Sequence, residues 1–186
     1  FNCGEPGPLR AMEEARVWRA FKAACSAGQL AVLVELREAR GEAVAAYLAG
    51  EGGNGWGGWL PVWEASLNGR LEVVEWLVGE VGASAGAADP SSGMSAVYIA
   101  AQQGHVGVVR VLHELGANVE TPRKDGVTPV YMAAEKGHVE VVRVLVEGGA
   151  HVNTADNQSM TPLCWAAMNG HLKLVQVLVE AGADKT

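Results

Sequence analysis

The chain has 186 residues; 49% are aliphatic, aromatic or cysteine residues, 19% are charged, and 24 are glycine. This globular composition excludes a collagen-like or highly charged disordered chain and argues against two large domains. The formal charge of −7, without a basic stripe, argues against nucleic acid and anionic membranes as partners, and no apolar run approaches the ~18 residues that span a bilayer.

The cysteine pattern bears on location. Cys3, Cys25 and Cys164 are odd in number and far apart, and no C-x-x-C pair occurs, so neither a disulfide framework nor a zinc site is indicated. We therefore expect an intracellular protein, cytoplasmic by default. The chain begins with Phe1 and not with Met, so an organelle reached after removal of a targeting segment stays open.

Two helical patterns separated by Gly28 fill about residues 11–40, and further helical residues follow from Glu42 to Leu48. The outward side of the first pattern is polar; it holds Glu13, Glu14, Arg16, Arg19 and Lys22. A stack of helix pairs needs such a polar face at its end. Residues 1–57 are therefore predicted to be N-terminal capping helices followed by a glycine-rich loop.

The glycine-rich stretch over residues 50–58 formally contains G-x-G-x-x-G at Gly50, Gly52 and Gly55. A dinucleotide-binding fingerprint needs a strand before it and a helix that opens at the third glycine. Here an alanine-rich helical stretch precedes the glycines, and Trp-Gly-Gly follows them. The stretch is therefore predicted to be an enlarged loop that binds no cofactor.

Three segments that start 33 residues apart, at Ser95, Thr128 and Thr161, share one pattern. They read S-A-V-Y-I-A-A-Q-Q-G-H, T-P-V-Y-M-A-A-E-K-G-H and T-P-L-C-W-A-A-M-N-G-H. Ser or Thr at the N-cap, then Pro at the first helical position, predicts a helix that the glycine ends in a tight turn. Apolar residues at helical spacing follow and predict a second helix, and only the next copy can cover the apolar face of such a pair.

The T-P-x-x-x-A-A-x-x-G-H pattern, together with G-A-x-V-N, resembles the ankyrin repeat. The resemblance is strong for residues 93–186, degenerate for about residues 58–90 and cap-like for about residues 11–40. The degenerate copy departs from the family at Leu60, Trp63 and Arg70, which replace Thr, His and His. The resemblance implies an all-α fold, an ankyrin-repeat solenoid of stacked helix–turn–helix units with extended hairpin-like loops. We expect one continuous array of about four repeats, over residues 58–90, 91–123, 124–156 and 157–186.

His105, His138 and His171 recur once per repeat, which raises the question of a metal site. Stacked helices lie roughly 8–10 Å apart, whereas zinc needs its ligands within about 2.1 Å. We therefore expect each histidine to hydrogen-bond to a neighbouring turn, and we expect no metal and no cofactor. Cys25 and Cys164 fall within repeat helices and are predicted to be small apolar core residues. No P-loop, nucleophile elbow or paired carboxylate is recognisable, so the sequence predicts no enzyme activity.

Trp56, Trp59 and Trp63 cluster at the border of the glycine-rich loop and the degenerate repeat. They either pack beneath the irregular loop or expose an aromatic anchor of the kind that is common in binding hot spots. Trp63 starts a helix and is predicted to be buried. Trp56 and Trp59 are therefore the candidates for a surface role.

In the ankyrin family the loops and first helices form a concave surface that binds other proteins, so the resemblance implies that variable positions there contact the partner. With Trp56 and Trp59, the candidate partner-binding residues are Gln102, Gln103, Arg123, Lys124, Asp125, Glu135, Lys136, Asn157, Gln158, Met160, Trp165, Met168 and Asn169. Val127, Ser91, Ser92 and Met94 share this surface. Its mixture of charged, polar and apolar side chains suits a protein partner and does not suit phosphate.

The sequence thus predicts a non-enzymatic protein–protein interaction module, a scaffold or accessory subunit of a larger assembly. One alternative is the interaction arm of a larger enzyme or channel, which a native polypeptide well above 19.4 kDa would reveal. Another is a small-molecule or pigment carrier that uses the tryptophan cluster, which an absorbance spectrum would test. The identity of the partner stays open.

The last predicted helix, from His171 to Glu180, has few polar interruptions, and a capping repeat would have more of them on its outer face. We therefore expect an exposed apolar edge of roughly a few hundred Å² at this end, covered by a partner or by further chain. Its expected members are Leu172, Leu174, Val175, Val177, Leu178 and Val179.

Overall fold

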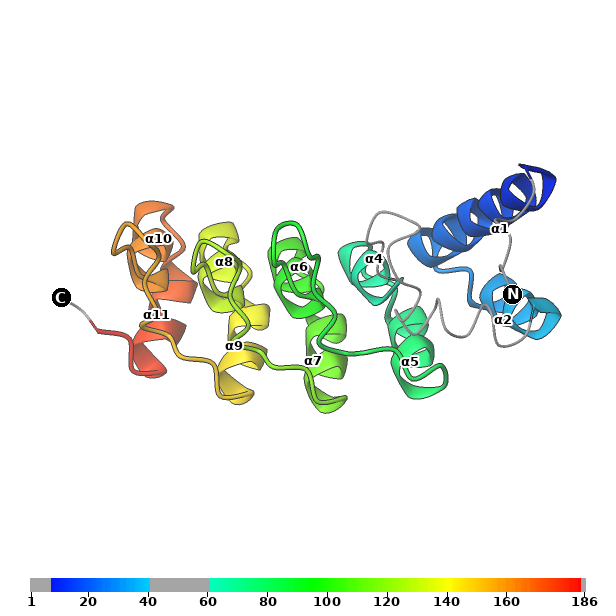
Figure 1. Ribbon diagram of the computed structural model, residues 1–186. Helices are drawn as coiled ribbons and strands as arrows, with labels where there is room; N and C mark the ends of the chain where they lie inside the picture. Colours follow the sequence, from blue (N-terminus) through cyan, green and yellow to red (C-terminus); the bar gives the residue numbers. More distant parts are fainter. Residues whose placement is uncertain (1–7, 41–60, 185–186) are drawn as a thin grey trace.

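The computed structural model describes residues 8–40 and 61–184. In these ranges, helix pairs stand side by side in a row, and each pair packs against the pair before it in the sequence (Figure 1). The described residues form helices without a named strand, and an isolated β-bridge joins Ala88 to Ser95. The predicted all-α solenoid of stacked helix–turn–helix units is confirmed.

The helix pairs follow the repeat pattern of the sequence. The N-terminal pair is α1 (Pro8–Ala27) and α2 (Leu30–Arg40), and the degenerate copy gives α4 (Pro61–Leu67) and α5 (Leu71–Gly79). The three regular copies give α6 (Ala96–Gln103) with α7 (Val106–Glu114), α8 (Pro129–Lys136) with α9 (Val139–Glu147), and α10 (Pro162–Met168) with α11 (Leu172–Glu180). The predicted glycine-rich loop lies outside the described residues. None of the helices described here is long and apolar enough to cross a bilayer.

The N-caps that the sequence predicts are present. The side-chain oxygens of Ser95, Thr128 and Thr161 accept hydrogen bonds from backbone N–H groups three residues later, at 3.0, 3.3 and 3.3 Å respectively. Pro129 and Pro162 occupy the first helical positions, where a missing N–H costs nothing. Each first helix therefore begins at the same point of its repeat.

The first helices α6 and α8 end, as predicted, at glycines in the left-handed region. A histidine of the next repeat lies across each of these turns. Gly137 has φ +78°, and a Cβ atom there would lie 2.7 Å from Cε1 of His171. Gly170, at the uncovered end, has a similar φ but no neighbouring atom within 4 Å. Positive φ and close packing thus both require glycine at position 137.

A ladder of hydrogen bonds links successive turns, and in each rung the later repeat donates to a backbone carbonyl of the earlier one. The rungs are Arg70 Nε to Ser26 O (2.7 Å), His105 Nε2 to Leu67 O (3.1 Å) and His138 Nε2 to Gln102 O (3.0 Å). The predicted bonding of His105 and His138 is therefore confirmed. Arg70, which departs from the family pattern, makes the same kind of contact as the histidines.

A continuous apolar core runs along the array between the helix pairs. Cys25 lies in this core as predicted, and burial raises the pKa of its thiol to about 12. Two expectations about single residues are wrong. Cys164, in the last repeat, is half-buried because no helix pair covers its outer side among the described residues, and Trp63 is also half-buried.

The C-terminal edge is narrower than predicted. Leu174, Val177 and Leu178 are buried, because this side of α11 packs against α9 and α10. The exposed apolar side chains at this end are Met168 and Leu172, with exposed fractions of 67% and 77%. Apolar spacing alone does not distinguish the side of a helix that faces its own repeat from the side that faces the next one.

Small alanines allow the first helices to approach closely, and one pair of equivalent residues tests this. Ala134 of α8 is fully buried against α10, whereas Ala167, its equivalent in α10, is exposed. We expect Ala134→Leu to lower the free energy of unfolding by about 1–3 kcal/mol, because the added carbons have no space. Ala167→Leu should change it by less than about 0.5 kcal/mol. Urea unfolding of both variants measures the difference, and equal losses would rule out the close helix contact.

Candidate functional site

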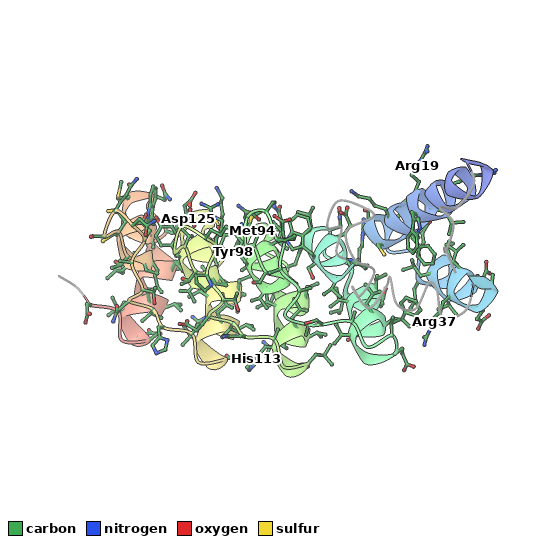
Figure 2. All side chains as sticks on the ribbon, in the orientation of Figure 1. Arg19, Arg37, Met94, Tyr98, His113 and Asp125 are labelled. Carbon is green, nitrogen blue, oxygen red and sulfur yellow. The ribbon has the colours of Figure 1, made fainter. Side chains whose placement is uncertain are left out.

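We define the loop face as the first helices α6, α8 and α10 together with the loop segments that precede them, residues 89–94, 123–127 and 156–160. The first helices form one row of the array and the second helices form the other (Figure 1). Met94, Tyr98 and Asp125 lie along the row of first helices, and His113 lies on the row of second helices (Figure 2). The loop face thus brings together side chains from three repeats.

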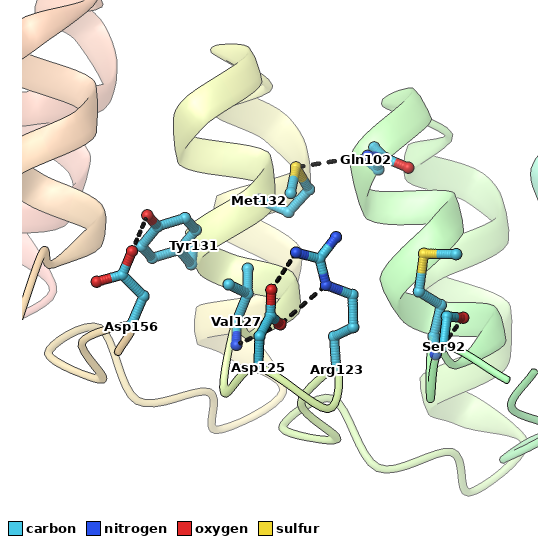
Figure 3. A network of polar contacts seen from close by, with 9 residues as sticks. Ser92, Gln102, Arg123, Asp125, Val127, Tyr131, Met132 and Asp156 are labelled. Carbon is cyan, nitrogen blue, oxygen red and sulfur yellow. Dashed lines mark hydrogen bonds and ion pairs between the residues drawn. The ribbon is translucent and has the colours of Figure 1, made fainter. Parts of the chain in front are cut away.

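An apolar cluster separate from the main core runs along the loop face. We call it the apolar strip; it consists of the buried Tyr98, Val127, Tyr131 and Met132 and the half-buried Met94, Met160 and Trp165. The rings of Tyr131 and Trp165 meet edge to face with centroids 6.2 Å apart. Gln102 Nε2 lies 3.6 Å from the sulfur of Met132 and donates to it (Figure 3). The half-buried members leave apolar surface that another molecule can reach.

An aspartate closes the turn in the first and third loops. Asp156 accepts hydrogen bonds from two backbone N–H groups of its own loop at 2.8 and 2.9 Å. Asp89 accepts from the backbone N–H of Ser92 at 2.8 Å and from the hydroxyls of Ser91 and Ser92. These bonds, with that of Ser91 the largest cause, lower the pKa of Asp89 from 3.8 to about 2. Both carboxylates therefore stabilise the loops in their ionised form.

In the middle loop, Arg123 occupies the position that Asp89 and Asp156 have in the other two loops. The backbone N–H of each of these three residues donates to the carbonyl of the last residue of its own loop. Asp125 takes over the closing role and accepts a hydrogen bond from the backbone N–H of Val127 at 3.4 Å. Arg123 donates to both carboxylate oxygens of Asp125, through Nε at 2.8 Å and through Nη2 (Figure 3). This pairing is the main cause that lowers the pKa of Asp125.

Tyr98 and Tyr131 occupy equivalent positions but differ in their hydroxyl contacts. The Tyr131 hydroxyl donates to Asp156 Oδ2 at 2.7 Å (Figure 3). Tyr98 instead meets Arg123, whose guanidinium carbon lies 5.9 Å from the ring centroid, and its buried hydroxyl has no hydrogen-bond partner in the described structure. Burial is the main cause that raises the pKa of Tyr98 to about 12. A buried hydroxyl without a hydrogen bond costs about 1–3 kcal/mol of stability. The Tyr98 hydroxyl is such an unsatisfied group.

A family profile for ankyrin repeats, in three copies, matches residues 21–123 and 99–186. The chain belongs to the ankyrin repeat family. A comparison with curated proteins finds no match to it. This match confirms the resemblance identified in the sequence. Ankyrin repeats are generally protein–protein interaction modules and are typically not enzymes.

Most candidate residues of this ankyrin array lie on or beside the loop face and keep some exposure. Exposed are Gln103, Lys124, Lys136, Asn157, Gln158, Met168 and Asn169, and half-buried are Gln102, Arg123, Asp125, Glu135, Met160 and Trp165. Trp56 and Trp59 lie outside the described residues. Val127, expected to face a partner, is buried because its side chain joins the apolar strip, so that expectation is wrong.

Two candidates have structural contacts that the sequence did not predict. Lys124 Nζ donates to the carbonyls of Pro90 and Ser91 at 2.8 and 2.6 Å, and so ties one ankyrin loop to the preceding one. Asn169 Nδ2 donates to the carbonyl of Glu135 at 3.0 Å. Within the described ranges, no three His, Cys, Asp or Glu side chains come together to hold a metal ion.

The sequence reasoning missed Tyr98, Tyr131 and Asp156. A signal for the first two was available, since tyrosine recurs at the fourth position of two successive repeat patterns. The difference between Arg123 and Asp156, which stand 33 residues apart, was also visible in the sequence. What the spacing could not reveal is that each tyrosine reaches the loop of the following repeat.

The tyrosine pair gives a matched prediction. Tyr131→Phe should lower the free energy of unfolding by about 1 kcal/mol, because it removes the hydrogen bond to Asp156. Tyr98→Phe should leave stability unchanged or raise it, since its hydroxyl is buried without a partner. Urea unfolding of both variants measures this, and a loss at Tyr98→Phe as large as that at Tyr131→Phe would contradict the assigned contacts.

The loop aspartates predict an acid dependence of stability. The folded-state pKa of Asp89 is about 2, below its ordinary value of 3.8, so its contribution is fully present above pH 3.8 and is lost as the pH falls toward 2. We expect the urea midpoint of Asp89→Asn to change less over this interval than that of the unmodified protein. Parallel pH profiles for the two proteins would contradict a stabilising role of the ionised Asp89.

Proposed function

We propose that this chain is a non-enzymatic protein–protein interaction module that serves as a scaffold or accessory subunit of a larger assembly. Its partner is another protein, and the contact surface is the loop face. The proposal includes no nucleic acid as partner. It places the module inside the cell, in keeping with the unpaired thiol of Cys25 in the core.

The observation that carries the proposal is the apolar strip with its polar border. Protein interfaces combine a centre of aromatic and methionine side chains with a polar rim. Here Met94, Met160 and Trp165 are half-buried and so present apolar surface on the loop face. Exposed polar side chains border them; these are Gln103, Lys136, Asn157 and Gln158.

A second contact is proposed at the C-terminal edge. Met168 and Leu172 expose most of their apolar side chains there, and Ala167, next to Met168 in α10, is exposed as well. Equivalent residues of the preceding repeat, Glu135 and Val139, are half-buried beside the next helix pair. A partner or further chain that covers this edge would bury the same surface that each internal repeat buries.

Site-specific photo-crosslinking in native extract tests which surface binds. A benzophenone amino acid placed at Gln103 or Asn157 lies on the loop face, and one placed at Glu114 or Lys173 lies on the second helices; all four positions are exposed. We expect a defined crosslinked protein from the first two positions and none from the other two. Crosslinks confined to the second helices would contradict the loop face as the contact surface.

A further inference from the structure

We propose that the chain binds a second copy of itself head to tail, with the outer side of α1 and α2 of one copy packed on the outer side of α10 and α11 of the other. This inference rests on the second contact of the proposed function, at the C-terminal edge, and names its occupant. The two helix pairs stand at opposite ends of the row (Figure 1).

The C-terminal edge exposes a position that the earlier helix pairs bury. Ala167 of α10 is exposed, and Leu172 of α11 is 77% exposed. The residues at the position of Ala167 in the four earlier pairs are buried; they are Cys25, Ser66, Ala101 and Ala134. This position therefore lies on the side of a repeat that packs against the next repeat.

The outer side of α1 and α2, which we call the N-terminal edge, exposes positions that the later helix pairs bury. Ala20 is exposed, whereas its equivalents are buried; they are Pro61, Ala96, Pro129 and Pro162. Val32 is 37% exposed, whereas its equivalents are at most 2% exposed; they are Val73, Val108, Val141 and Leu174. Because these positions stay buried in the last repeat, they lie on the side that packs against the preceding repeat. The two edges are thus the two halves of one interface between repeats.

An internal junction shows how the two edges would meet. In it, Cδ2 of Leu71 lies 3.7 Å from the position that a Cβ atom of Gly107 would take. Leu71 corresponds to Leu172, and Gly107 corresponds to Ala31, which is exposed on α2. Head-to-tail stacking therefore packs Leu172 of one copy on Ala31 of the other and removes apolar surface of both from water.

The ladder of turn contacts leaves an acceptor open at the C-terminal edge. At each of the four described junctions, a side chain of the later repeat donates to the backbone carbonyl two residues before the turn glycine; these carbonyls belong to Ser26, Leu67, Gln102 and Glu135. The equivalent carbonyl in the last repeat is that of Met168. The turn at Gly170 beside it has no neighbouring atom within 4 Å of a Cβ position, so a donor from another molecule can reach this carbonyl.

The N-terminal edge holds a matching donor. Gln29 has the position of the ladder histidines, because its backbone N–H donates to the carbonyl of Ala24 as that of His138 donates to Ala133. The Gln29 side chain is exposed, and its amide group carries two N–H donors. In the head-to-tail contact this amide donates to the carbonyl of Met168 of the other copy and adds one more rung to the ladder.

The two ends that meet carry opposite charge. Four basic and two acidic side chains give residues 16–39 a formal charge of +2, and three acidic and one basic side chain give residues 156–184 a formal charge of −2. The formal charge of −7 of the whole chain repels a second copy, but the ends attract each other. Charge complementarity of this kind favours contact between unlike edges over contact between like edges.

One residue of the N-terminal edge opposes the contact. Glu35 is exposed at the position that Val144 and Val177 occupy in the last two repeats. Burial of a carboxylate without a partner is costly, so Glu35 keeps the association weak. Glu35→Val should therefore raise the association constant about tenfold, whereas a contact elsewhere on the chain would not respond.

Sedimentation velocity of the full chain over a range of concentrations tests the proposal. The two edges differ, so each bound copy still has one free edge, and the contact can continue to a third copy. We expect the weight-average mass to rise beyond that of a dimer as the concentration increases. A chain that stays monomeric up to about 1 mM overturns the proposal.

Two variants then assign the contact to the edges. Leu172→Lys blocks the C-terminal edge and Val32→Lys blocks the N-terminal edge, and each should lower the association constant about tenfold or more. A mixture of the two variants should form a dimer that does not grow, because one intact edge of each kind remains. Leu115→Lys is the matched control, since Leu115 is 39% exposed in an internal repeat, and it should associate like the unmodified chain. Urea unfolding checks that these exposed substitutions leave the fold intact.

The outcomes separate the second copy from the proposed function. Association that one of the two variants blocks and the other does not would join like edges and overturns the head-to-tail contact. A benzophenone amino acid at Met168 in native extract should crosslink to another copy of this chain. A crosslink from Met168 to a different protein keeps the second contact of the proposed function and overturns the second copy. The loop face is decided separately, by the crosslinks from Gln103 and Asn157.

Discussion

Each ankyrin repeat of this chain can bury its apolar side only against its neighbours, and the rest of the structure follows from that constraint. The alanine pairs of α6 and α8 are fully buried, so successive first helices pack with little side chain between them. Where no neighbour is described, the same position is open, as Ala167 and Leu172 are at the C-terminal end. Burial in this protein is thus a property of the interface between repeats rather than of any one repeat.

This packing gives the loop face its character. Because capped helices start at the same point in each repeat, the loops before them recur at fixed intervals and meet the side chains of the preceding repeat. A tyrosine in one repeat therefore contacts the first residue of the next loop, and a change at that one loop residue changes the bond. Arg123 is such a change: it converts an acceptor position into a donor position. In an array of near-copies, the differences between copies are where specificity can arise.

The sequence predicts the local features well because each depends on a short stretch of chain. The caps at Thr128 and Thr161, the turn at Gly137 and the contacts of His138 all follow from residue type and position within one repeat period. The contacts of the loop face were not predictable in this way. The bond from Tyr131 to Asp156 joins residues 25 positions apart, and only the stacking geometry brings them together.

The C-terminal helix shows the same limit of the sequence in another form. Its apolar residues divide between two sides, one packed against α9 and α10 and one facing outward. Periodicity identifies both sides as apolar but does not say which is covered. It therefore predicts an exposed edge that includes Leu174 and Val177, whereas the exposed apolar side chains are those of Met168 and Leu172. Val127 was misplaced for a related reason, since a loop residue can join an apolar cluster that only the fold creates.

The ladder of turn contacts also has a direction. In each rung the donor side chain, as in Arg70 or His138, belongs to the later repeat, and the acceptor is a backbone carbonyl of the earlier one. Synthesis on the ribosome releases the earlier repeat first. Each carbonyl acceptor therefore leaves the ribosome before the side chain that donates to it, so the order of synthesis matches the direction of the ladder.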